Sequence, residues 1–97
     1  MPKYISLIRY TSQGIEHITE SPNRLDEARQ LGESMGIDLQ EFNLTFGQYD
    51  AVVTLEAPDD ETAAQFALRV GSEGAIETET MRAFDEDQFR EVIDGIP

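Results

Sequence analysis

The chain has 97 residues, of which 20 are Asp or Glu, 7 are Lys or Arg and none is Cys, and its formal net charge is −13. This length predicts one domain over residues 1–97, which buries only about 60–65% of the surface that the unfolded chain exposes, so a partner subunit would add stability. The missing thiols exclude disulfides, zinc–thiolate sites, iron–sulfur clusters and thiol catalysis, and the charge argues against nucleic-acid binding, which draws much of its affinity from Lys and Arg contacts to phosphates.

The first third of the chain predicts a strand and then helices. Residues 4–10 (YISLIRY) are rich in the aromatic and β-branched side chains that strands favour. One or two helical turns follow over 14–18. A longer helix begins at Ser21, a good N-cap with Pro22 at the first helical position. Gly36 ends this helix, because a helix commonly stops at a residue in the left-handed conformation.

Two strands joined by a tight turn come next. Residues 39–46 alternate polar and apolar side chains as a half-exposed strand, and residues 49–56 alternate more strictly. One face of the second strand carries Tyr49, Ala51, Val53 and Leu55. We expect Gly47 in the turn to take a positive φ, which hairpin turns demand and glycine adopts at little cost.

A helix, a strand and a short helix complete the chain. Asp59 is placed to cap a helix that ends at 71–74, residues 75–84 form a fourth strand, and Asp85 starts the terminal helix. The resulting βαββαβ order predicts the α+β class. More closely, it predicts a ferredoxin-like fold with a C-terminal helix, in which two helices cover one face of a four-stranded antiparallel sheet.

The second face of that sheet is too apolar to leave in water. Its predicted side chains are Val52, Thr54, Ile76 and, depending on the register, Ile8 and Tyr10. Packing of two sheets face to face would bury them. We therefore expect a homodimer or a higher homo-oligomer.

Short motifs in a fixed order run from end to end of the chain: YISL at 4–7, SP at 21–22, GQYD at 47–50, APDD at 57–60 and ETETMRAF at 77–84. In this order and spacing they resemble the GYD domain family of small prokaryotic proteins. The resemblance implies a ferredoxin-like domain of the dimeric α+β barrel group, and it implies little about chemistry.

The wider group to which the resemblance points has two kinds of member. Some dimeric α+β barrels are cofactor-independent monooxygenases, isomerases or dehydratases with a pocket between sheet and helices. Others are ligand-sensing domains of feast/famine regulators, which have a similar Gly-x-x-Asp turn. The resemblance therefore leaves both an enzymatic and a ligand-binding reading open.

Four residues are candidates for binding a small-molecule ligand. Asp50 is predicted on the dimer-facing side of its strand, where a carboxylate needs an arginine, backbone amides or a ligand as its partner. Arg82 and Thr80 share one face of the last strand, and an arginine fork suits a carboxylate ligand or a protein acid. Tyr10 would line a pocket with its polar tip. His17, the only histidine, is a weak candidate for a catalytic base.

The function that these patterns favour is small-ligand binding or oligomer formation by a small dimeric α+β barrel domain. A cofactor-independent enzyme of the monooxygenase or isomerase type, and a purely structural oligomer module, remain alternatives. No cofactor or metal site is predicted, since the sequence has no phosphate-binding glycine loop and no histidine cluster. It has no apolar run long enough to span a bilayer and no export leader, so we expect no membrane partner and a cytoplasmic location.

Salt is expected to stabilise the chain. Lys3 is the only lysine among the 7 basic residues, and carboxylates are in large excess. Such a composition suits a salty cytoplasm, because about 1 M salt screens the repulsion between carboxylates beyond ~3 Å. We predict that the free energy of unfolding rises when KCl is raised from 0.1 to 2 M in urea titrations. A stability that stays level or falls over this range would remove the halophilic interpretation.

Overall fold

The fold is one antiparallel sheet with helices packed on a single face. The computed structural model describes residues 1–97. Its strands are β1 (Lys3–Tyr10), β2 (Asp38–Leu44), β3 (Ala51–Glu56) and β4 (Ile76–Ala83). Its helices are α1 (Ser12–Glu16), α2 (Ser21–Ser34), α3 (Asp60–Gly71) and α4 (Glu86–Asp94), with a 3₁₀ turn at Ile18–Glu20.

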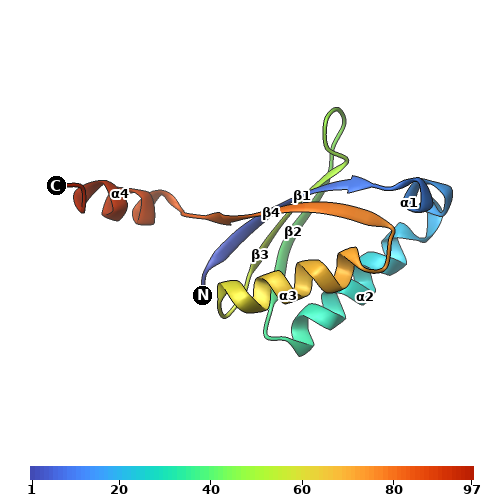
Figure 1. Ribbon diagram of the computed structural model, residues 1–97, viewed down its shortest axis with the longest axis horizontal. Coiled ribbons are helices and arrows are strands. Elements are labelled where there is room, and N and C mark those ends of the chain that lie inside the picture. Colours follow the sequence, from blue (N-terminus) through green and yellow to red (C-terminus); the bar gives the residue numbers. More distant parts are fainter.

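The strands are arranged in the order β2-β3-β1-β4, and every neighbouring pair is antiparallel. Helices α2 and α3 lie on one side of this sheet, while α4 extends away from the end of β4 (Figure 1). The predicted α+β class, the ferredoxin-like βαββαβ order and the C-terminal helix are therefore confirmed. None of the helices combines the length and the apolar character that crossing a membrane requires.

The hydrophobic core lies between the sheet and these two helices. Alternation along the central strands turns every second side chain toward α2 and α3. The most deeply buried core residues are Tyr4, Ile8, Ile37, Ala51, Val53, Leu55, Ala57, Ala63 and Phe66. The predicted inward face of Ala51, Val53 and Leu55 is thus confirmed.

Helix ends follow the predicted chemistry with one exception. Asp59 accepts a hydrogen bond from the Thr62 amide at 2.8 Å, and this bond lowers the pKa of Asp59. Asp85 caps α4 in the same way. The prediction that Ser21 is an N-cap is wrong, because the preceding 3₁₀ turn runs directly into α2 and places Glu20 at the cap position.

The predicted positive φ of Gly47 is confirmed, with a value of 106°, and Gly36 ends α2 with a φ of 77°. Both positions demand a conformation that L-residues with a side chain rarely adopt. The turns after α2 and before β3 therefore depend on glycine.

The second sheet face carries a different set of residues from the one predicted. Ile8, Tyr10 and Ile76 lie on the helix-covered face, since Tyr10 pairs with Ile76 in register and Ile8 is part of the core. The placement of Ile76 on the open face is therefore wrong. The open face instead carries Ile5, Leu7 and Met81 beside the predicted Val52 and Thr54.

Helix α1 packs backbone against backbone. A Cβ added at Gly14 would lie 2.1 Å from the carbonyl oxygen of Ala75, a separation that real side chains do not reach. The Thr11 hydroxyl strengthens this contact by donating to the Gly74 carbonyl at 2.6 Å. Gly14 thus fixes how the chain leaves β1 and enters α2.

Replacement of this glycine should be costly. We predict that Gly14→Ala lowers the free energy of unfolding by about 1–3 kcal/mol or more, because the added methyl group meets rigid backbone. Gly71→Ala is the matched control, since nothing lies within 4 Å of the Cβ built there. Urea titration of both variants measures the difference, and equal stabilities would contradict the close packing of α1.

Candidate functional site

Hydrogen bonds hold the turn between β2 and β3 to the end of β1 and within the turn itself. The Tyr10 amide donates to Asp50 Oδ2 at 2.8 Å, and the Asp50 amide donates to the Ile8 carbonyl at 2.8 Å. The Thr45 hydroxyl donates to the Tyr49 carbonyl at 2.7 Å. The Asp50 carboxylate therefore acts as an acceptor at the end of β1, where its regular pairing with β3 stops.

Tyr49 lies outside the strand that was predicted to contain it. Its hydroxyl donates to Glu79 at 2.9 Å, which raises the pKa of Tyr49, and the Arg9 guanidinium lies 4.6 Å from its ring centroid. Both partners belong to the open face. The prediction that Tyr49 shares the inward face of Ala51 is wrong, because the turn breaks the alternation before β3 begins.

Arg82 lies at the opposite end of β1. It is in register with Tyr4, and its Nε atom is 3.8 Å from Asp60 Oδ1. The Tyr4 hydroxyl donates to the same carboxylate, and burial of the phenol followed by this hydrogen bond raises the pKa of Tyr4 to about 12. Since Asp50 is bound at the Tyr10 end of β1, the structure does not bring Arg82 and Asp50 together.

A cavity of about 100 Å³ lies between the helix-covered face of the sheet and the helices α2 and α3. Of the 22 residues that line it, 14 are hydrophobic. Small side chains on the inner sides of the helices, Ala28 on α2 and Ala63 and Ala67 on α3, leave this space. Such a cavity is the usual form of a binding site for a small, mostly apolar molecule.

Several polar side chains of the cavity wall are already paired with each other. The hydroxyls of Ser6 and Thr80 are 2.9 Å apart, and those of Tyr10 and Ser21 are 2.8 Å apart. Ser6 is the buried polar residue of the sheet, with 6% of its surface exposed. Its pairing removes the cost of burying a free hydroxyl under the helices.

The predicted site residues therefore divide into two groups. Tyr10, Thr80 and His17 line the cavity, whereas Asp50 and Arg82 do not. Ligand binding by any of these residues, and catalysis by His17, stay predictions.

The sequence analysis missed four polar residues of the cavity wall: Ser6, Ser21, Arg24 and Glu73. Thr78, which shares the strand face of Thr80, lines the cavity as well. One signal was available, since Ser6 alternates with Tyr4 and Ile8 and so occupies a core position of β1. For a metal, no three His, Asp or Glu side chains gather closely enough to hold one. The expectation of no metal and no cofactor stays a prediction.

Comparison with known proteins places the chain in a family. The family model described as GYD domain matches residues 4–93. The chain belongs to the GYD domain family. This GYD domain is also similar to a protein of Thermus thermophilus named glutamine synthetase and cystathionine beta-lyase binding protein, with 33% identity over 84 residues, or 86% of this chain and 88% of that protein. The resemblance seen in the short motifs is confirmed.

The role of Asp50 in this GYD domain is open to a direct test. We predict that Asp50→Ala lowers the free energy of unfolding by about 1–3 kcal/mol, because the Tyr10 amide loses its acceptor. Asp50→Asn should cost much less, since its amide oxygen still accepts this hydrogen bond. Chemical denaturation measures both, and an Asp50→Ala variant as stable as the unchanged chain would show that the carboxylate is not needed by the fold.

Proposed function

We propose that this chain is a binding protein that pairs with a second copy of itself through its open sheet face and α4 and, as a dimer, associates with metabolic enzymes. The single observation that carries the proposal is α4, an amphipathic helix that is held clear of the body with its apolar side uncovered. The open sheet face supports the self-association. The Thermus relative supports the enzyme partners.

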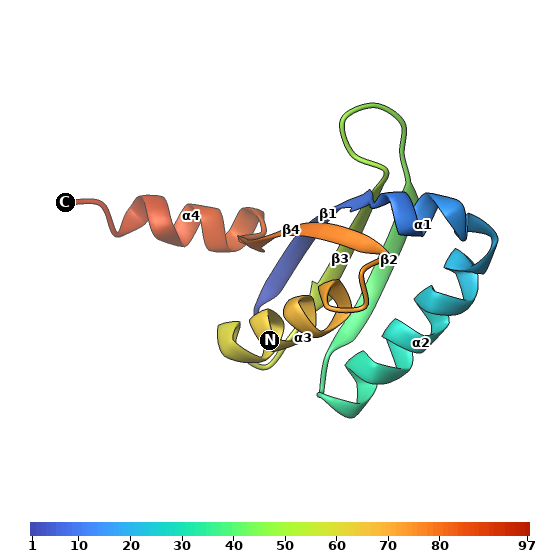
Figure 2. The same ribbon diagram turned by 45° about the vertical axis from the view of Figure 1, so that its right-hand side comes forward.

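The apolar side of α4 needs a protein surface. It is formed by Phe89, Val92 and Ile93, which follow the i, i+3, i+4 spacing of one helix face, and Ile96 lies just beyond the helix end; these four side chains are 48–63% exposed. Figure 2 shows α4 well separated from the sheet and from the other helices. An isolated helix of 9 residues is marginal in water, so packing against a partner would supply its stability.

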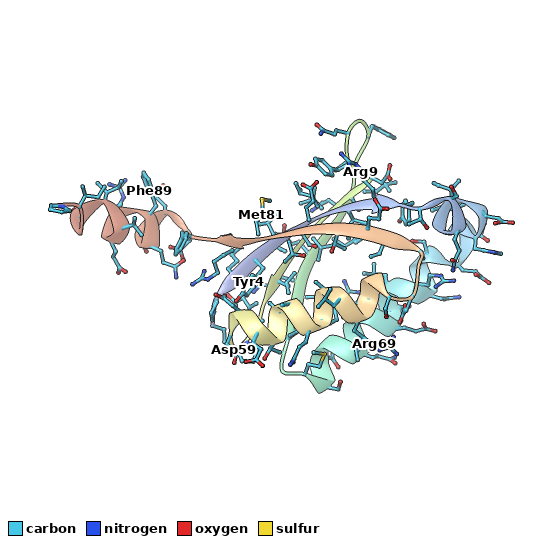
Figure 3. The ribbon with its side chains drawn as sticks, viewed as in Figure 1. Tyr4, Arg9, Asp59, Arg69, Met81 and Phe89 are labelled. Carbon is cyan, nitrogen blue, oxygen red and sulfur yellow. The ribbon has the colours of Figure 1, made fainter.

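The open sheet face offers a matching apolar centre. Ile5 and Leu7 of β1 lie between Val52 of β3 and Met81 of β4. Figure 3 shows Met81 and Arg9 on the side of the sheet away from α2 and α3, with Phe89 on the same side. Phe89 therefore extends the apolar surface of the open sheet face toward α4.

Charges surround this apolar centre in a pattern that suits two identical copies. Lys3 is in register with Glu56, and Arg9 is in register with Glu77, so both signs are present on the face. A two-fold dimer places the same surface on both subunits, and such mixed charges allow positive groups to meet negative ones across it. A second copy is thus the occupant that the face favours.

The relative supports the further step to enzyme partners. Its name states that it binds glutamine synthetase and cystathionine β-lyase, and the similarity covers most of both chains. The family model covers residues 4–93 of this chain, a range that includes most of β1, the GQYD turn and most of α4. We therefore propose for this chain the same general activity, the binding of metabolic enzymes.

Dimer formation is tested by placing a charge in the open face. We predict that the chain sediments as a dimer at equilibrium and that Leu7→Glu makes it a folded monomer, because burying an unpaired carboxylate between two sheets is costly. Leu68→Glu is the matched control, since Leu68 is 75% exposed on α3. A monomeric unchanged chain in stabilising salt, or a Leu7→Glu variant that stays dimeric, would refute this assembly.

Enzyme binding is tested with two purified proteins. We predict that the glutamine synthetase or the cystathionine β-lyase of the organism that encodes this chain co-sediments with the dimer, and that Phe89→Ser weakens the complex because it removes an apolar contact of the dimer surface on which enzyme binding depends. Arg90→Gln, on the charged side of α4, serves as the control. If the intact dimer binds neither enzyme, the proposal of enzyme partners fails while the proposal of a dimer stands.

A further inference from the structure

The cavity between the sheet and the helices α2 and α3 has two chemically different ends. Tyr10 closes β1, Ser21 opens α2 and His17 lies between them, so these polar side chains gather where β1 finishes. At the other end, Leu39 and Leu55 are neighbours in register. A molecule in the cavity would meet polar groups at one end and hydrocarbon at the other.

The volume of the cavity limits the size of the molecule. An engineered apolar cavity of about 150 Å³ holds benzene. The space here is about 100 Å³ and is partly open to solvent at its polar end, where His17 is exposed. Because the head group would lie at the open polar end, only the hydrocarbon part has to fit inside, which limits it to a chain of about four to six carbons.

The polar side chains of the cavity wall that have no hydrogen-bond partner determine which head group a bound molecule can have. The Glu73 carboxylate already accepts a hydrogen bond from Arg69 at 3.2 Å. Beyond the hydroxyl pairs described above, the side chains left over in the cavity wall are those of His17, Arg24 and Thr78. All three can donate hydrogen bonds, and one carries a permanent positive charge.

Arg24 is weakly held by the protein itself. Its contact with Glu20 is 3.8 Å long, beyond the 2.7–3.2 Å range of a hydrogen bond, and Glu20 is mostly exposed. About a third of the Arg24 side chain is exposed, with a value of 34%. Its guanidinium fork is therefore available to a ligand carboxylate, which it can bind with two parallel hydrogen bonds.

We infer that this cavity binds a small aliphatic monocarboxylate of about four to six carbons. The carboxylate lies on Arg24, beside His17 and Thr78, and the hydrocarbon chain points toward Leu39 and Leu55. The site uses the face of the sheet opposite the proposed dimer surface, so it is independent of that assembly.

Most of the carboxylates behind the net charge of −13 lie away from the cavity; of the two near Arg24, Glu73 is paired with Arg69 and Glu20 is mostly exposed. At physiological ionic strength, charges more than about 8 Å away are largely screened. Arg24 acts at contact distance beside an apolar wall, where the effective dielectric constant is lower than in water. The local cation therefore outweighs the distant carboxylates.

Calorimetric titration of the chain with hexanoate, at a salt concentration that keeps the chain folded, tests whether Arg24 binds the carboxylate head group. We expect saturable binding that Arg24→Gln weakens at least about tenfold, as loss of a charge-assisted hydrogen bond predicts. Arg29→Gln is the matched control on the same helix, since Arg29 pairs with Asp26 and does not line the cavity. Equal weakening by the two variants, or no binding of hexanoate, would overturn the inference.

The shape of the site is tested in the same way. Ala67 lines the cavity on α3 and Ala64 is exposed on the same helix, so Ala67→Leu should abolish hexanoate binding and Ala64→Leu should leave it unchanged. Hexylamine, which has the same chain and the opposite charge, should not bind. Binding of hexylamine as tight as that of hexanoate would contradict the role of Arg24, and unchanged binding by a folded Ala67→Leu variant would place the ligand elsewhere.

Discussion

A sheet has two faces, and this chain supplies helices for one of them. Its strands alternate side chains between the faces, so the choice of which side chains are covered is made by register alone. Tyr4, Ser6 and Ile8 lie beneath α2 and α3, while Ile5 and Leu7 lie on the other side. Both the cavity and the open face result from this one arrangement, because a single pair of helices cannot cover two sheet surfaces.

The covered face combines tight and loose packing. Tyr4 is buried beside Asp60 at the start of α3, and Gly14 brings α1 into direct backbone contact with the residue before β4. Between these places, alanines on the inner sides of the helices leave room. A chain of this length has little stability to spare, so an unfilled volume in its core is a cost that ligand binding would offset.

Most of the fold was predictable because its signals are local. The alternation in β3, the capping carboxylates Asp59 and Asp85 and the glycines at 36 and 47 each depend on a few neighbouring residues. The assignment of Ile76 to a sheet face was wrong because it depends on pairing between β1 and β4, which are far apart in sequence. Tyr49 was misplaced because the turn before β3 ends the alternation that the sequence pattern suggested.

The candidate site was less predictable for the same reason. From the sequence, Asp50 is a carboxylate with no evident partner. In the structure its partner is the Tyr10 amide, a backbone group that no sequence motif reveals. Arg24 is in a run of charged residues on α2, and only the packing of that helix on the sheet places it at the cavity. Family membership identifies the domain, and the chemistry has to be argued from these contacts.

The central claim is that a second copy of the chain covers the open face. The most direct measurement is isotope-filtered NMR on a mixture of labelled and unlabelled chains, which detects only contacts between subunits. The account predicts intermolecular NOEs between the methyl groups of Leu7 or Met81 and side chains of the partner copy, including aromatic signals from Phe89. Methyl groups on this face that show only intramolecular NOEs, in a sample that sediments as a monomer, would contradict it.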